Sequence, residues 1–259
     1  MKRILTLRDN KRQQAHLWEG HRIEDEVAAC SDRTIARVFL DLLPKNEEIL
    51  EAGCGLGAWV IFLQKRGYRI SGIDNNTAVI GQLKQWDPGL RVFAGDILRL
   101  PQADQALGAY ISLGVVEHFE DGPEPPLREA LRVLRPEGLL VFTVPFNNIF
   151  RRLIAHPLRE GYLFFHRLTG RRAFFAEYRY SRREVQRMIE EAGFVIQDIS
   201  TDDFATKTRS LTLWSEFPFL RSRKGPYLLN VIGKSIAWIF NTVSRNILSS
   251  GILIIARKP

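Results

Sequence analysis

The chain has 259 residues, of which 45% are hydrophobic and 25% charged, which is ordinary for a globular protein with enough apolar material for one large domain. Two cysteines and a basic, polar start exclude a disulfide-stabilised secreted scaffold and predict a cytoplasmic protein, with contact to the inner face of the membrane as a further option. The net charge of +8 predicts an acidic partner or substrate.

Residues 1–44 are expected to form an N-terminal arm and a helix. Residues 1–20 are basic and polar, include His16 and Trp18, and show few periodic apolar positions, so we expect a loosely docked arm. Residues 22–43 are predicted to form one helix because Ile23, Val27 and Ile35 recur on one helical face, and Pro44 closes the segment.

Residues 45–145 alternate between short apolar runs and amphipathic segments. We expect strands at 48–51, 69–73, 91–94, 109–113 and 139–144, and helices at 58–66, 77–85 and 125–134. This alternation predicts an α/β fold with a doubly wound, Rossmann-like sheet that has helices on both faces. Ligands of such sheets collect at the carboxyl ends of the strands.

A glycine-rich turn follows the first of these strands and reads Glu51-Ala-Gly-Cys-Gly-Leu-Gly57. Alternating glycines permit a tight turn and a close approach of a ligand to the backbone, so the turn predicts a nucleotide-like cofactor. The pattern alone also fits a dinucleotide loop. Asp74 follows Gly53 by 21 residues, at the end of the second strand, where a carboxylate can accept hydrogen bonds from ribose hydroxyls.

Three later segments combine with the turn: Gly95-Asp-Ile-Leu98, Ser112-Leu-Gly-Val-Val-Glu-His-Phe119 and Ala130-Leu-Arg-Val-Leu-Arg-Pro-Glu-Gly-Leu-Leu-Val-Phe142. In this order the set resembles the class I S-adenosylmethionine-dependent methyltransferases, in their small-molecule branch (type 11/23). The resemblance covers about residues 45–145 and resumes at 178–200. It implies a seven-stranded mixed sheet with an antiparallel last strand and helical cap insertions, and S-adenosyl-L-methionine as the cofactor.

The resemblance also implies site residues. Glu51 would lie near the methionine amino group, and Asp74 would hold the ribose hydroxyls. Asp96 would accept from the adenine amino group. The remaining implied contacts are the backbone bed of Gly53, Gly55 and Gly57, Asn75 beside the adenine, the backbone of Ile97, and Leu113 with Gly114 at the methionine end.

Methyl transfer from a sulfonium is an in-line displacement in which the protein mainly supplies geometry and desolvation. A general base helps when the acceptor is a hydroxyl or a protonated amine, and His118 is the best candidate by position, with Glu117 beside it. Alternatively, both residues cap the next helix or shape the cofactor pocket. The five histidines are scattered, so we predict no metal site.

Residues 146–180 form a predicted cap rich in aromatic residues and arginine. Residues 151–187 contain ten arginines against three glutamates. Arginine suits phosphate and carboxylate groups, so we expect a small, anionic or lipid- or saccharide-like acceptor that is methylated at oxygen. A nucleic-acid surface and a plain solvated surface are the alternatives for this segment.

Residues 181–259 are expected to complete the single methyltransferase domain. A helix at 181–192 begins at a capping box formed by Ser181 and Glu184, and strands follow at 194–199 and 252–256. A second insertion spans 202–248, irregular at first and helical at 227–248. Charges interrupt this helix, so we expect it to pack on the cap and core rather than to span a membrane, with an interfacial position as the alternative.

The rival functions are an RNA methyltransferase and a non-catalytic S-adenosylmethionine-binding module. An NAD-dependent oxidoreductase is disfavoured by Asp96 and by the Glu117-His118 pair. The acceptor and the oligomeric state stay open.

Overall fold

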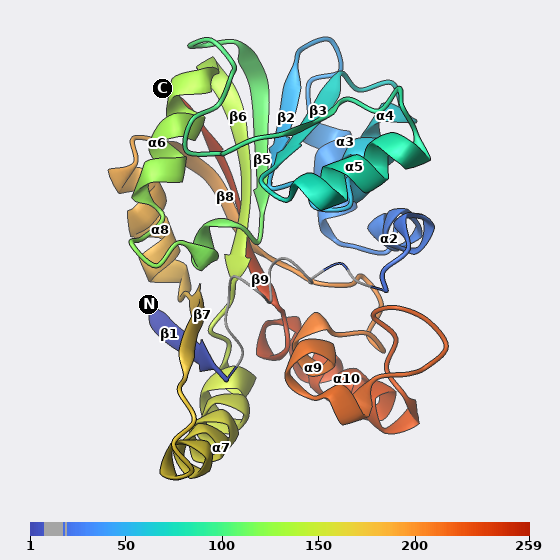
Figure 1. Ribbon diagram of the computed structural model, residues 1–259, viewed down its shortest axis with the longest axis vertical. Coiled ribbons are helices and arrows are strands. Elements are labelled where there is room, and N and C mark those ends of the chain that lie inside the picture. Colours follow the sequence, from blue (N-terminus) through green and yellow to red (C-terminus); the bar gives the residue numbers. More distant parts are fainter. Residues whose placement is uncertain (8–17, 19) are drawn as a thin grey trace.

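The computed structural model of the protein describes residues 1–7, 18 and 20–259; most of the expected N-terminal arm, including His16, lies outside these residues. A central sheet carries helices on both of its faces (Figure 1). Two appended parts, built around α7 and α10, lie at the lower end of the view.

The central sheet has seven strands, in the order β4-β3-β2-β5-β6-β9-β8. The strands are β2 (Ile49–Ala52), β3 (Ile70–Asp74), β4 (Val92–Ala94), β5 (Leu107–Leu113), β6 (Leu134–Pro145), β8 (Val195–Asp202) and β9 (Gly251–Arg257). β2 to β6 run parallel, and β9 runs antiparallel to both of its neighbours, β6 and β8. The predicted mixed sheet with an antiparallel last strand is confirmed, and the loops after β2 to β5 meet at one edge.

Helices cover both faces of the sheet, as the alternating pattern predicted. One face packs against α2 (Ile23–Cys30), α3 (Ile35–Leu42), α4 (Ala58–Gln64) and α5 (Thr77–Trp86). The other packs against α6 (Glu124–Val133) and α8 (Arg182–Glu191). The predicted capping box of α8 is present, because Ser181 Oγ accepts from Glu184 N and the Glu184 carboxylate accepts from Ser181 N.

The prediction of one helix over 22–43 is wrong, because α2 and α3 are separate. The chain turns at 31–34, where the backbone N–H of Thr34 donates to the carbonyl of Asp203 at 3.0 Å. Arg33 forms an ion pair with Asp202 at the same turn. These partners lie about 170 residues away in the chain. Their contacts hold the backbone of this turn outside a helical conformation.

The first residues of the chain form a strand rather than a loose arm. β1 (Lys2–Thr6) pairs antiparallel with β7 (Phe174–Arg179) in a two-stranded sheet of its own. The cap between β6 and β7 starts with a π-helical segment, Arg151–Ala155, and continues as α7 (His156–Leu168). The cap is therefore largely helical.

The second insertion holds α9 (Leu211–Glu216), a 3-10 turn at Pro218–Leu220, α10 (Val231–Val243) and another 3-10 turn at Arg245–Ile247. A small core joins it to the cap through Phe150, Leu213 and Ala237. The expected helix over 227–248 is shorter because the Asn230 side chain caps α10 by accepting from Gly233 N at 2.9 Å.

The expectation that this helix buries its apolar side is wrong for several large residues, since Val231 is 80% exposed and Trp238 53% exposed. Across the described residues, every helix is too short or too polar to cross a bilayer.

Candidate active site

The glycine-rich turn after β2 adopts the backbone that its glycines predicted. Gly53, Gly55 and Gly57 all have positive φ angles, of 78°, 49° and 64°. The backbone N–H groups of Gly53 and Cys54 donate to the carbonyl of Ile73 at 2.7 and 3.0 Å, which fixes the turn to β3. A side chain at Gly55 would collide with the Trp18 ring, which lies against this turn.

A cavity of about 410 Å³, here called the loop-side cavity, opens beside this turn. It brings together residues that follow β2, β3, β4 and β5. Of the predicted site residues it is lined by Gly53, Gly55, Asp74, Asn75, Asp96, Ile97, Leu113, Gly114 and His118.

Two carboxylates of the loop-side cavity are held by backbone donors. Asp74 accepts from the N–H groups of Gly55 and Asn76 at 2.8 and 2.9 Å. Asp96 is exposed and accepts from Leu98 N at 2.9 Å. A carboxylate has about four lone-pair positions, so both side chains retain capacity for a ligand.

A second cavity of about 420 Å³, the cap-side cavity, lies between the sheet edge and the two insertions. It is lined by Glu51 and Glu117 from the sheet side, and by Arg151, Arg159, Arg179 and Glu216 from the insertions. Trp18, Gly53, Leu113 and Gly114 line both cavities, so the two meet at the loops after β2 and β5.

Gly57 departs from the expected backbone bed, because it lines neither of these two cavities. It precedes α4, and a Cβ there would contact Leu83 of α5 at 3.2 Å. Gly57 therefore serves the packing of α4 and α5 behind the turn.

Glu51 is a buried acid with an unsatisfied oxygen. It is the last residue but one of β2 and is 3% exposed, and its Oε2 has no hydrogen-bond partner in the described part of the chain. Burial, reinforced by the negative charge of Asp74, raises the pKa of Glu51 to about 8. Such a carboxyl group is suited to a cationic partner.

Glu117 and His118 lie on a 3-10 turn, Val116–His118, after β5. They face different cavities: Glu117 lines the cap-side cavity and His118 the loop-side cavity. Glu117 is 2% exposed, its Oε2 lacks a hydrogen-bond partner among the residues described, and burial raises its pKa to about 7 despite the nearby His118.

His118 is oriented by the backbone of β7, since its Nδ1 lies 2.9 Å from the carbonyl oxygen of Ala176. Burial opposes the charged imidazolium, but the Glu117 carboxylate and this carbonyl outweigh burial and raise the pKa of His118 above its usual value. An Nδ1–H that donates to Ala176 leaves Nε2 as the second polar atom of the ring.

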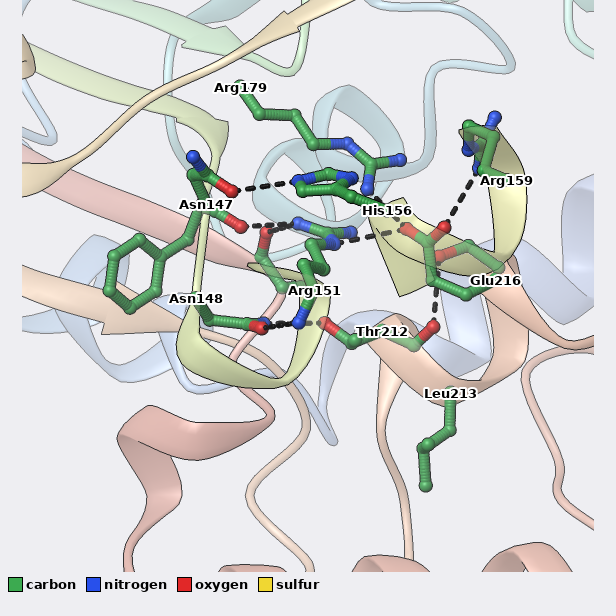
Figure 2. A network of polar contacts seen from close by, with 12 residues as sticks. Asn147, Asn148, Arg151, His156, Arg159, Arg179, Thr212, Leu213 and Glu216 are labelled. Atoms are coloured by element: carbon green, nitrogen blue, oxygen red, sulfur yellow. Dashed lines mark hydrogen bonds and ion pairs between the residues drawn. The ribbon is translucent and has the colours of Figure 1, made fainter. Parts of the chain in front are cut away.

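The wall of the cap-side cavity holds a cluster of three guanidinium groups around one carboxylate (Figure 2). Glu216 has a side chain only 2% exposed and lies within 3.1 Å of Arg151 Nε, 2.8 Å of Arg159 Nη2 and 2.7 Å of Arg179 Nη1. Burial alone would raise the pKa of Glu216, but these three cations lower it to about 2.

Arg151 of this cluster is also bound to the backbone. Its Nη1 donates to the carbonyls of Phe146 and Ser250 at 2.7 and 2.8 Å. Burial and the adjacent Arg179 lower the pKa of Arg151 to about 10. His156 lies in the same region in Figure 2, and burial together with Arg179 lowers its pKa to about 4, so this histidine is neutral.

The cluster carries an excess of positive charge. Glu177 pairs with Arg179 at 2.7 Å, so among the described residues two carboxylates oppose three guanidinium groups in this cluster. Arg179 Nη1 is close to Glu216 but without hydrogen-bond geometry, and Arg159 Nε has no partner in the described structure. The arginine-rich segment predicted a basic cap. Glu216 was not predicted, because no sequence pattern points to it and it lies 57 residues beyond Arg159.

Comparison with known proteins identifies the family. A family model described as "Methyltransferase domain" matches residues 50–142, which run from β2 and the glycine turn through most of β6. Residues 50–142 belong to a class I S-adenosylmethionine-dependent methyltransferase domain. S-adenosyl-L-methionine is the cofactor of this domain.

Two curated relatives agree with this assignment. A protein of Mycolicibacterium smegmatis named "Probable S-adenosylmethionine-dependent methyltransferase" is 27% identical over 59% of this chain and 54% of its own length. The malonyl-[acyl-carrier protein] O-methyltransferase of Serratia marcescens is 32% identical over 46% of this chain and 47% of its own length. The chain thus spans about half the length of these relatives.

Solved structures share the methyltransferase fold along nearly the whole chain. A chain from the complex between the Haloferax volcanii Trm112 methyltransferase activator and a methyltransferase matches with a TM-score of 0.62 at 17% identity. The match covers 98% of both chains.

Proposed function

We propose that this chain is an active methyltransferase that binds S-adenosylmethionine across the two cavities and transfers its methyl group to an oxygen atom of a small anionic acceptor. When bound, the cofactor supplies an electrophilic methyl group on a sulfonium. The chain's own residues must bind this donor, orient the acceptor, exclude water and remove a proton.

The residues present fit the cofactor. The unpaired, buried oxygen of Glu51 suits the methionine ammonium group, which would keep this carboxyl group ionised. Asp74 would accept from the ribose hydroxyls, and Asp96, with the backbone of Ile97, would bind the adenine edge beside Asn75. Gly53, Leu113 and Gly114 would bind the methionine end, since they line both cavities.

The proposal of an anionic acceptor rests on the arginine cluster of the cap-side cavity. Within this cluster, three guanidinium groups face two carboxylates among the described residues, whereas the acids Glu51 and Glu117 line the sheet side of the same cavity. Arg159 Nε has no hydrogen-bond partner in the described structure. A phosphate or carboxylate on the acceptor would balance this charge and accept from the planar forks. An uncharged acceptor would leave the guanidinium groups of this wall without such a partner.

Glu117 is our candidate for the base. It faces the cap-side cavity, carries an unpaired oxygen, and has a pKa of about 7, close to the value that makes a general base efficient near neutral pH. An acceptor hydroxyl within reach of Glu117 would lose its proton to this carboxylate. His118, on the loop-side cavity, would orient Glu117 by charge and contact the cofactor side.

Two measurements test the proposal. S-adenosylhomocysteine should raise the thermal midpoint whereas NAD should not, since a ligand of the native state stabilises it. Labelled methyl transfer should then be screened over hydroxy compounds with and without a phosphate or carboxylate group.

The Arg159→Met variant should lose transfer to the anionic acceptor, while Arg167→Met, an exposed arginine on the same helix, should keep it. Cofactor binding without transfer to any member of the panel would favour the non-catalytic alternative. Transfer to RNA instead would show that the acceptor is a nucleic acid and not a small anionic molecule.

A further inference from the structure

Helix α7 presents its large apolar side chains outward. Leu158, Phe165 and Leu168 are spaced for one helical face and are 59%, 69% and 69% exposed. The opposite face holds buried Leu163 and His156, the latter joined to Asn147 at 2.8 Å. The usual distribution of a surface helix is therefore reversed, because the polar contacts lie inside and the apolar stripe lies outside.

Helix α10 shows the same reversal. Its buried face is made of the small residues Gly233 and Ala237, with Phe240 partly buried beside them. Its outward face carries Val231, Trp238 and Val243, which are 80%, 53% and 76% exposed. Small residues that face inward and large apolar residues that face outward indicate a surface that contacts something other than water.

The two reversed faces belong to one end of the molecule. In Figure 1, α7 and α10 both lie at the lower end, beyond the carboxyl edge of the central sheet. The segments beside the two helices extend the apolar character, since Leu153, before α7, is 69% exposed and Phe219, before α10, is 74% exposed.

The charge around these helices has a single sign. Residues 217–259 contain no aspartate or glutamate, and within them Arg221, Arg223, Lys224, Lys234 and Arg245 are exposed. Residues 146–176 contain one acid, Glu160, which is paired with Lys2, and four exposed arginines: Arg152, Arg167, Arg171 and Arg172. Exposed apolar side chains flanked by cations complement a surface that is apolar below a negatively charged layer.

We propose that the outward faces of α7 and α10 dock the protein on an anionic lipid surface. The apolar side chains enter the boundary between head groups and acyl chains, and the flanking cations bind the head groups. A second copy of the chain fits less well, because two such surfaces would bring nine exposed cations of each copy together without acids to oppose them. The docking surface is separate from the cofactor residues, although α7 also carries Arg159 of the cap-side cavity.

Vesicle binding of the full chain tests the inference. Sedimentation with vesicles of phosphatidylcholine alone is compared with vesicles of phosphatidylcholine and phosphatidylglycerol in equal amounts. We expect binding to the anionic vesicles that weakens with salt. The pairs Phe165→Ser with Leu168→Ser, and Trp238→Ser with Val243→Ser, should each lower the vesicle affinity at least ~tenfold.

The matched control is Leu40→Ser with Val195→Ser, two apolar residues 45% and 51% exposed on α3 and β8, which should bind like the unchanged protein. Arg171→Ser with Arg172→Ser should weaken binding and reduce its dependence on salt. Circular dichroism and the stabilisation by S-adenosylhomocysteine should be the same in all variants, which keeps a folding defect apart from a docking defect.

Three results would overturn the inference. The first is no sedimentation with either vesicle by a folded protein that binds S-adenosylhomocysteine. The second is vesicle binding that the two apolar pairs leave unchanged. The third is a dimer, measured by light scattering without lipid, that the same pairs dissociate, because the faces would then bind a second copy of the chain.

Discussion

The carboxylate of Asp74 accepts the backbone N–H of Gly55 at 2.8 Å, so the acid at the end of β3 holds the glycine turn that follows β2. The second oxygen of Asp74 accepts from Asn76 N at 2.9 Å. One side chain therefore both shapes the turn and faces the loop-side cavity.

Asp74→Ala should affect the protein with and without cofactor. Two backbone donors lose their acceptor, at about 1 kcal/mol each, so the free energy of unfolding of the cofactor-free protein should fall. Affinity for S-adenosylhomocysteine should fall as well, measured by calorimetry. Asp96→Ala, at an exposed acid with one local contact, should weaken cofactor binding but leave the cofactor-free stability unchanged. Equal loss of stability in both variants would contradict this division.

Glu51 should make the cofactor-free protein less stable as the pH rises. Its pKa of about 8 lies above the ordinary value of 4.5, so the folded state holds a proton that the unfolded state has released between these values. Stability from this group is full below about pH 4.5 and declines as the pH rises toward 8.

Glu51→Gln tests this directly. The variant should show a smaller fall in thermal midpoint between about pH 6 and about pH 9 than the unchanged protein. It should also bind S-adenosylhomocysteine more weakly, because the ammonium group loses its carboxylate. A variant with the same pH slope as the unchanged protein would remove Glu51 as the source.

Removing Glu216 should be costly because it leaves three buried or half-buried arginines without their shared partner. We expect Glu216→Gln to lower the free energy of unfolding by about 3–5 kcal/mol in urea titrations. Glu120→Gln, which breaks the exposed pair with Arg3, should cost about 0–1 kcal/mol. The pKa of about 2 means that the stabilisation from Glu216 is complete above about pH 4.5 and is lost as the pH falls toward 2.

Substitutions of Glu117 and His118 should affect different kinetic quantities. With the acceptor in hand, Glu117→Gln should lower kcat by about 10²-fold or more, and the rate of the unchanged enzyme should rise with pH through about 7 as this carboxyl group ionises. His118→Asn should mainly raise the Kd of S-adenosylhomocysteine, since His118 faces the loop-side cavity. A large loss of kcat in His118→Asn with unchanged cofactor affinity would make the histidine the base.

The sequence predicted the parts of the fold that depend on neighbours along the chain. The alternation over 45–145 requires only local periodicity, and the glycines at 53 and 55 require positive φ angles whatever lies far away. The capping box of Ser181 and Glu184 is likewise complete within four residues. Each of these features is determined by residues close to it in the sequence.

The parts that the sequence did not predict depend on distant partners. β1 is a short, half-polar strand whose partner, β7, lies about 170 residues later. The break at Arg33 and Thr34 depends on Asp202 and Asp203. The cap was expected to be helical, but the bounds of α7 were not predicted, because its apolar stripe faces away from the core and does not identify a buried face.

Arg151 places a constraint on the order of assembly during synthesis. Its guanidinium group bonds the carbonyl of Phe146, the carboxylate of Glu216 and the carbonyl of Ser250, which is 99 residues further along. A chain that emerges from its amino end thus exposes this arginine long before its last partner appears. Arg151 can complete this set of hydrogen bonds only after the segment that leads into β9, the strand beginning at Gly251 between β6 and β8, has been made.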